Sequence, residues 1–288
     1  MAQPNHVENP FEFIIEKLAW AVGDIGRAVL PNPARHVGQA IPVVRKLTLG
    51  DLSDALKKGL ADVGGLRDDI LFIGLIYPLA GLVFARLAFS LDLLPLLFPL
   101  ASGFALIGPV AAIGLYELSR RRELGDHVTW LDAFGVFRSP AMPSIIGLGA
   151  ILLGLFAVWL GVAYEIYLLN LGGEGPQTVA AFEQSVLHTP GGWTMIGAGF
   201  GVGFFFALAA FAISVVSFPL LLDRDVGMWR AIGTSLRVVA ANPVVMFIWG
   251  AIVAGALALG SLPALVGLVL VVPVLGHASW HLYRKAVG

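Results

Sequence analysis

Cysteine is absent from this chain of 288 residues, so no disulfide, thiolate metal site or cysteine nucleophile can form within it. Charged residues are scarce as well: they make up 13% of the chain, against roughly 25% in a soluble domain. The net charge is −1, which gives no indication of a basic surface for nucleic acid. Composition therefore argues against a soluble globular protein and predicts no nucleic-acid partner.

The sequence also lacks the common catalytic motifs. It contains no Walker phosphate-binding loop, no HExxH zinc motif and no GxSxG nucleophile turn. We therefore expect no catalytic residues, no enzymatic activity and no resident cofactor.

Long hydrophobic runs are what the sequence has in abundance. Hydrophobic residues make up 58% of the chain and occur in blocks of helix length, and a membrane-spanning helix needs about 20 of them. The pattern predicts an all-α integral membrane protein with a six-helix transmembrane domain over residues 47–288. The last two spans could instead form one hairpin that enters the membrane without crossing. The expected spans are residues 70–89, 93–118, 145–169, 195–222, 244–259 and 262–282.

The placement of positive charge predicts the orientation of these spans. Of the 18 Lys and Arg residues, 17 lie in the N-terminal region, the tail and the loops at 120–143 and 223–243. The loops on the other side contain none, and Arg86 lies inside the first span. Positive residues stay on the cytoplasmic side of short loops, so we expect a multi-pass protein with both termini in the cytoplasm.

A repeated pattern divides the spans into three units. The second and sixth spans both carry a Pro-Val pair, Pro109-Val110 and Pro273-Val274, at the same distance before an aromatic and basic ending. Segments 49–63, 128–137 and 228–239, which precede the odd spans, have helical periodicity and one apolar face. We therefore predict three parallel units, each an interfacial amphipathic helix followed by a transmembrane hairpin. The expected interfacial anchors are Trp130, Trp229 and Trp280.

The N-terminal arm, residues 1–46, is predicted to be cytoplasmic. Asn9-Pro10 is typical of a helix start, and an amphipathic helix is expected over residues 10–30, followed by a linker. Its mixed charge argues against purely electrostatic binding to lipid, so the helix is interpreted as a docking surface for protein. Its apolar stripe is formed by Phe11, Ile14, Ile15, Leu18, Val22 and Ile25.

Two histidines form the candidate cofactor site. His277 and His281 are spaced i, i+4, so they share one helix face near the cytoplasmic end of the sixth span. This spacing could bind a metal or supply a haem ligand, with Glu117 as a carboxylate if the second and sixth spans pack together. The structural alternative is a pair of interfacial histidines bonded to carbonyls or lipid phosphates, and no metal ligand is assigned.

Arg86 and Glu165 are the candidate intramembrane charges. Both are predicted near the outer ends of their spans, where they could form an ion pair across the bundle. Ionisable residues within spans often line a solute path, so a gate on such a path is the functional alternative to structural pairing.

Three stretches resemble a known family. GLYELSRRRELGDHVTWLDAF from Gly114, FPLLLDRDVGMWRAIGTSLRVVAANP from Phe218 and GHASWHLYRKAV from Gly276 are similar, in that order, to the DUF2189 family of bacterial predicted integral membrane proteins. The resemblance covers residues 45–288 and implies a location in the bacterial inner membrane. It implies no activity, because the family is uncharacterised.

These features predict a non-enzymatic accessory, assembly or interaction subunit of a membrane complex. Its expected partners are the lipid bilayer and either another membrane protein or a second copy of the chain. The alternatives are a small-solute transporter or channel that uses Arg86 and Glu165, and a haem- or metal-binding membrane protein that uses His277 and His281.

Overall fold

The computed structural model describes residues 42–65, 82, 96–101, 108, 112–126, 128–172, 178–263 and 265–288. The described part is helical and contains no β-strand, only an isolated antiparallel bridge between Val44 and Val287. The all-α prediction is therefore confirmed. Residues 1–41 of the N-terminal arm, the first predicted span apart from residue 82, and almost half of the second span lie outside the described residues, so the count of six spans and the three-unit arrangement stay predictions.

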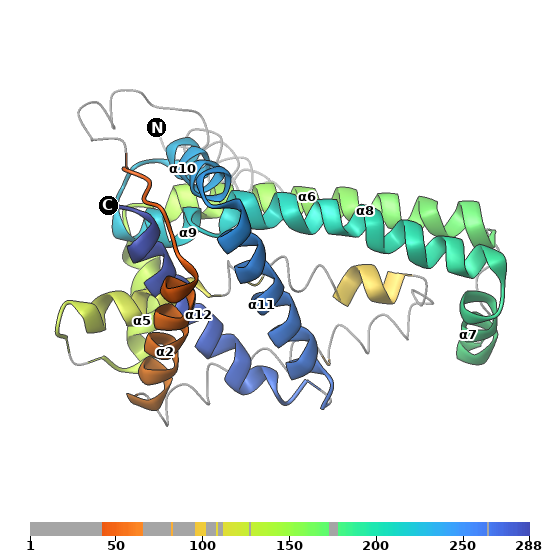
Figure 1. Cartoon of the computed structure of the whole chain (residues 1–288), viewed down its shortest axis with the longest axis horizontal. Helices are drawn as coiled ribbons and strands as arrows, with labels where there is room; N and C mark the ends of the chain where they lie inside the picture. The colour runs from red at the N-terminus through yellow and green to blue at the C-terminus, as the bar shows by residue number, and fades with distance from the viewer. Residues whose placement is uncertain are drawn as a thin grey trace, which may run out of the picture.

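Two long helices, α6 and α8, lie side by side along the longest axis of the molecule (Figure 1). Helix α6 covers Met142–Leu171 and α8 covers Pro190–Ser214. The short helix α7, Val179–Leu187, lies at one end of this pair, and the C-terminus of the chain lies at the other (Figure 1). Three helical segments of the described chain are long and apolar enough to cross a membrane: Met142–Leu171, Pro190–Asp223 and Pro243–Ser261.

The second of these segments is interrupted near its end. Helix α8 stops at Ser214, and α9, Ser217–Asp223, continues after a break just before Pro219. In a regular helix the Val216 N–H would donate to the Ala212 carbonyl. Here the Ser235 hydroxyl is inserted between them: it accepts from Val216 N at 3.2 Å and donates to Ala212 O at 2.7 Å. The helix expected over residues 195–222 is therefore broken, and α10, Met228–Ala241, satisfies the freed backbone groups.

The C-terminal helices differ from the prediction at their turn. Helix α11 covers Pro243–Ser261, whereas α12 covers Leu268–Ala286 and begins six residues later than the predicted sixth span. Residues 262–267 form the turn, in which Leu265 has a positive φ of 67°. Only the first half of α12 is continuously apolar, and its second half is polar and buried against other helices. Hydrophobicity alone could not separate the turn from the helix, because the turn also contains leucine and valine.

The amphipathic segments are helical where they were expected. Helix α2 covers Leu49–Gly65, and the 3₁₀ helix η3 covers Trp130–Arg138. Each begins at a Thr-x-x-Asp box, in which Asp51 and Asp132 accept hydrogen bonds from Thr48 and Thr129. The bonds from Thr48 lower the pKa of the Asp51 carboxyl to about 2. These boxes fix both helix starts.

Helix α2 does not match the interfacial description. It packs along the polar half of α12, beside α5, which covers Ile113–Glu123 (Figure 1). Its side chains Leu52 and Ala55 are buried in the core of the protein. The apolar face of α2 is thus covered by protein, whereas η3 keeps Phe134 and Phe137 exposed, as an interfacial helix would. We call the region where α2, α5, η3, α9 and α12 meet the polar end of the bundle.

Candidate functional site at the polar end

Two glycines allow three helices to meet closely at the polar end. A Cβ atom at Gly59 of α2 would lie 2.7 Å from Ala278 N and 2.8 Å from Val274 O of α12. A Cβ atom at Gly276 of α12 would lie 2.5 Å from a side-chain atom of Leu115 in α5. Because neither position has a side chain, α2 and α5 can both approach α12, and the polar groups between them come within hydrogen-bond distance.

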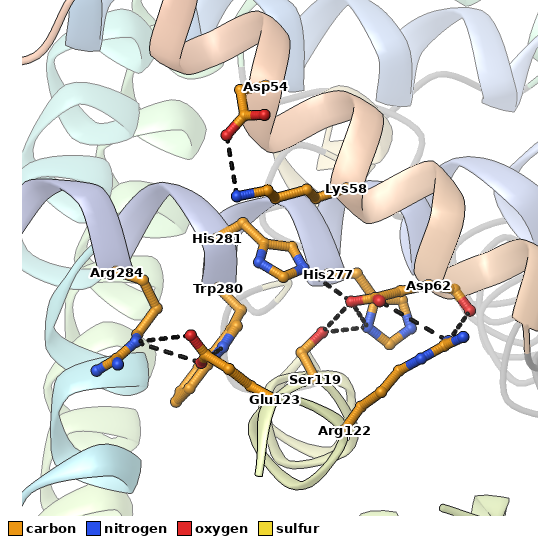
Figure 2. A network of polar contacts seen from close by, with 10 residues as sticks. All are labelled: Asp54, Lys58, Asp62, Ser119, Arg122, Glu123, His277, Trp280, His281 and Arg284. Carbon is orange, nitrogen blue, oxygen red and sulfur yellow. Dashed lines mark hydrogen bonds and ion pairs between the residues drawn. The ribbon is translucent and has the colours of Figure 1, made fainter. Parts of the chain in front are cut away.

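A chain of hydrogen bonds joins these three helices (Figure 2). Ser119 Oγ of α5 lies 2.7 Å from His277 Nδ1 of α12 and donates to Asp62 Oδ2 of α2 at 2.8 Å. The same Asp62 oxygen lies 2.8 Å from His281 Nε2, one turn further along α12. Arg122 of α5 donates to the backbone carbonyl of Asp62 at 2.9 Å. We call Asp62, Ser119, His277 and His281 the Asp62 cluster.

The geometry fixes the protons of the cluster. A hydroxyl has one proton, so Ser119 can donate to Asp62 only if it accepts from His277, which places the proton of His277 on Nδ1. His281 then donates from Nε2 to the carboxylate. The His277 side chain is fully buried, and its Nε2 atom has no hydrogen-bond partner among the described residues. With the proton on Nδ1, this nitrogen is a buried acceptor without a partner in the described part of the chain.

Asp62 is held in its charged form. Burial by itself would raise the pKa of the Asp62 carboxyl, but the hydrogen bonds from His281 and Ser119 outweigh it and keep the pKa below its usual value. The Arg122 guanidinium lies 3.7 Å from the other carboxylate oxygen. A carboxylate at neutral pH thus accepts bonds from two different helices.

Two further networks surround the cluster. Glu117 of α5 is buried and binds Arg120 at 2.8 Å and Arg121 at 2.6 Å, and Arg121 also reaches Asp132 of η3 at 2.5 Å. Glu117 can be buried because two arginines of its own helix neutralise its charge.

The other network ties α12 to α9 and to the start of α2. Asp223 of α9 accepts from the Tyr283 hydroxyl at 2.6 Å and from Arg284 at 3.3 Å. Lys285 binds Asp51 at 3.0 Å and Asp54 at 2.9 Å. The polar half of α12 is therefore bonded on several sides, and its ionic groups serve to hold helices together.

The structure brings together part of the predicted site. His277 and His281 lie on one face as expected, but the carboxylate beside them belongs to Asp62, whereas Glu117 binds arginines. No group of three or more His, Cys, Asp or Glu side chains with metal-binding geometry occurs in the described part of the chain. The histidine nitrogens that face Ser119 and Asp62 form hydrogen bonds with them. The Asp62 cluster therefore acts as a clamp that holds α2, α5 and α12 together.

The other predicted residues fall in different places. Glu165 is exposed on α6, while its expected partner Arg86 lies outside the described residues. Trp229 is exposed on α10, as an interfacial anchor requires, but Trp280 is fully buried and donates to Glu123 at 3.2 Å, which corrects its assignment as an anchor. Trp130 begins η3, and its side chain lies outside the described part. The docking residues from Phe11 to Ile25 also lie outside it.

Sequence reasoning missed Asp62 and Asn242. Asp62 lies on the edge of an amphipathic helix, where a charged residue is ordinary. Asn242, between α10 and α11, is buried; it accepts from Leu47 N at 2.8 Å and donates to Arg45 O at 3.0 Å. The only local signal was the Asn-Pro pair at a helix start, which does not reveal a partner 195 residues away.

Apolar helices long enough to cross a bilayer, joined to an ionic polar end, define an integral membrane protein. Residues 96–223 match the family model described as predicted integral membrane protein (DUF2189), so the resemblance to this family is confirmed. The match includes the stretch from Gly114 to Phe134, whereas the C-terminal stretch from Gly276 lies beyond it. No curated protein and no solved structure matches the chain.

Proposed function

We propose that this membrane protein is a non-enzymatic accessory, assembly or interaction subunit of a membrane complex, located in the inner membrane with its polar end in the cytoplasm. The observation that carries the proposal is the closed state of the Asp62 cluster. Its polar side chains bind one another across three helices, and the Asp62 side chain is only 13% exposed. Groups that could act on a substrate are used to hold the polar end together.

The apolar helices support the same proposal. Within the most apolar windows of α6 and α11, 28% and 17% of the residues are buried inside the protein. Most of their surface is left to lipid or to another membrane protein. The predicted apolar stripe of the N-terminal arm would bind the same partner on the cytoplasmic side of the membrane.

Purification from native membranes in mild detergent tests the proposal. We expect the full-length chain to retain a partner in fixed stoichiometry, identified by mass spectrometry after cross-linking. Replacing Ile14 and Leu18 of the apolar stripe with serine should release that partner. Replacing Glu12 and Glu16 on the polar face with glutamine is the matched control and should leave it bound.

The same preparation separates the alternatives. A chain that always purifies alone and colourless contradicts a partner-dependent role and favours transport, which flux through liposomes would then test with Glu165→Gln. A Soret band or bound metal that disappears in His277→Ala with His281→Ala would establish the cofactor alternative in its place.

A further inference from the structure

A cavity of about 340 Å³ opens at the polar end, beside the start of α6. It lies between α5, η3 and the last turn of α9. Its volume falls at the lower end of the range for small-molecule sites, which suits a compact polar group. Its lining includes Glu117, Arg120, Arg121, Gly135, Arg138 and Ser139.

The charge in this cavity is predominantly positive. Three arginines line it against one carboxylate, Glu117. Glu117 accepts from Nε and Nη2 of Arg120 and from Nε of Arg121, so it holds both guanidinium groups in place while leaving some of their donors unused. Asp132 engages one further donor of Arg121. The site therefore has oriented donors in excess of its own acceptors.

Arg138 and Gly135 complete the cavity. Arg138 is exposed at the end of η3 and has no hydrogen-bond or ion-pair partner among the described residues. At Gly135, a Cβ atom would collide with Nη2 of Arg121, so only glycine leaves the guanidinium in its observed position. One arginine is thus unpaired within the part of the chain that the structure describes, and the space beside another is kept open.

The cavity lies beside the start of α6, a helix that is long and apolar enough to cross a membrane. Ser139, which follows η3, lies three residues before α6, the 30-residue apolar helix whose positive dipole end faces this region. On the outer side of η3, Phe134 and Phe137 are 52% and 67% exposed and stack with ring centroids 6.3 Å apart. Exposed phenylalanines on one face of a short helix are typical of a helix that lies in the headgroup plane, and basic pockets at that level bind anionic headgroups.

We propose that the cavity between α5, η3 and α9 binds a phosphate group through Arg120, Arg121 and Arg138. Guanidinium groups match phosphate oxygens in planar, two-point contacts, which explains three arginines around one small cavity. The phosphate belongs to an anionic phospholipid headgroup or to a small soluble phosphate ester. The exposed aromatic face of η3 favours the lipid.

Binding of defined lipids to the detergent-purified full chain tests this site. Native mass spectrometry would count bound phosphatidylglycerol and, as a neutral-headgroup comparison, phosphatidylcholine, while glycerol 3-phosphate and inorganic phosphate serve as soluble competitors. Arg138→Gln should weaken phosphatidylglycerol binding about tenfold, the loss expected for one charge-assisted contact. Arg138→Lys should restore part of it. Arg237→Gln is the matched control, because Arg237 is an exposed arginine of α10 outside the cavity.

Each outcome decides the proposal. Preference for phosphatidylglycerol that Arg138→Gln weakens about tenfold and Arg237→Gln leaves intact supports a lipid-phosphate site. Displacement by glycerol 3-phosphate, with the same dependence on Arg138, supports the phosphate site with a soluble ligand. Equal losses in both variants would show general surface charge, and no binding of either phosphate source would overturn the proposal. Circular dichroism of each variant confirms that it is folded.

Discussion

Replacing Asp62 with alanine removes the carboxylate that joins α2 to both α5 and α12. Ser119 and His281 each donate to it at 2.8 Å. A hydrogen bond to a charged group contributes about 1.5–3 kcal/mol. Because the Asp62 side chain is 13% exposed, we take the lower value for both bonds and expect a loss of about 3 kcal/mol. For a protein of this size, that lowers the Tm by about 6–12 °C.

Thermal unfolding of the purified chain, followed by tryptophan fluorescence, measures this loss. Trp280 is a suitable reporter because it is buried on the same helix as His277 and His281. Asp54→Ala is the matched control: Asp54 also lies on α2 but forms exposed pairs with Lys58 and Lys285. Because exposed ion pairs contribute little to stability, its loss should change the Tm much less than the loss of Asp62. Equal shifts in Tm for the two variants would refute the claim that the Asp62 cluster clamps the helices.

The pH dependence gives a second check of the same clamp. The pKa of the Asp62 carboxyl is lowered in the folded protein, by hydrogen bonds that outweigh the effect of burial. A lowered pKa stabilises the folded state above the unfolded carboxyl pKa of about 3.9, and that contribution is lost as the pH falls through the folded value. The difference in Tm between the wild type and Asp62→Asn should therefore be constant from about pH 5 to 7 and shrink below about pH 4. A difference that grows on acidification would contradict this assignment.

Four other substitutions test how the helices pack, each by the change in Tm. Gly59→Ala should destabilise the folded protein by about 1–3 kcal/mol, because the added Cβ would collide with the backbone of α12. Gly64→Ala is its control: the added Cβ would meet nothing within 4 Å, so the substitution should stabilise the folded protein by about 0.5–1 kcal/mol. Ser235→Ala should cost about 1–3 kcal/mol because two backbone groups at the α8–α9 break lose their partner; an unchanged Tm would show that the helix closes by itself. Asn242→Ala should cost about 2–3 kcal/mol, since three hydrogen bonds of a buried side chain are lost.

The helices that the sequence predicted well are those with a local signal. The amphipathic segments expected at 49–63 and 228–239 appear as Leu49–Gly65 and Met228–Ala241. Helical periodicity is a property of neighbouring residues, so it could be read directly. The interruption before Pro219 could not, because it depends on Ser235 of another helix entering the backbone.

The candidate site was only half predictable for the same reason. The spacing of His277 and His281 placed them on one face, but their carboxylate, Asp62, lies 219 residues before His281 in the sequence. Glu117 appeared the better candidate because it lies near the end of a span with a similar ending. Its two arginine neighbours in the next turn were the signal for an internal ion pair.

Packing in a membrane gives these few polar contacts a large part in determining the fold. Lipid chains are as apolar as leucine, so burying the apolar faces of α6 or α11 against other helices gains little over burying them in lipid. Close approach at glycines and hydrogen bonds between helices are then the contacts that select one arrangement. In this chain they are concentrated at Gly59, Asp62, Ser235 and Asn242. Substitutions there should change the structure more than replacing an exposed apolar residue of α6, such as Leu153, with another apolar residue. This holds although α6 has the highest mean hydropathy of the three described helical segments that are long enough to cross a membrane.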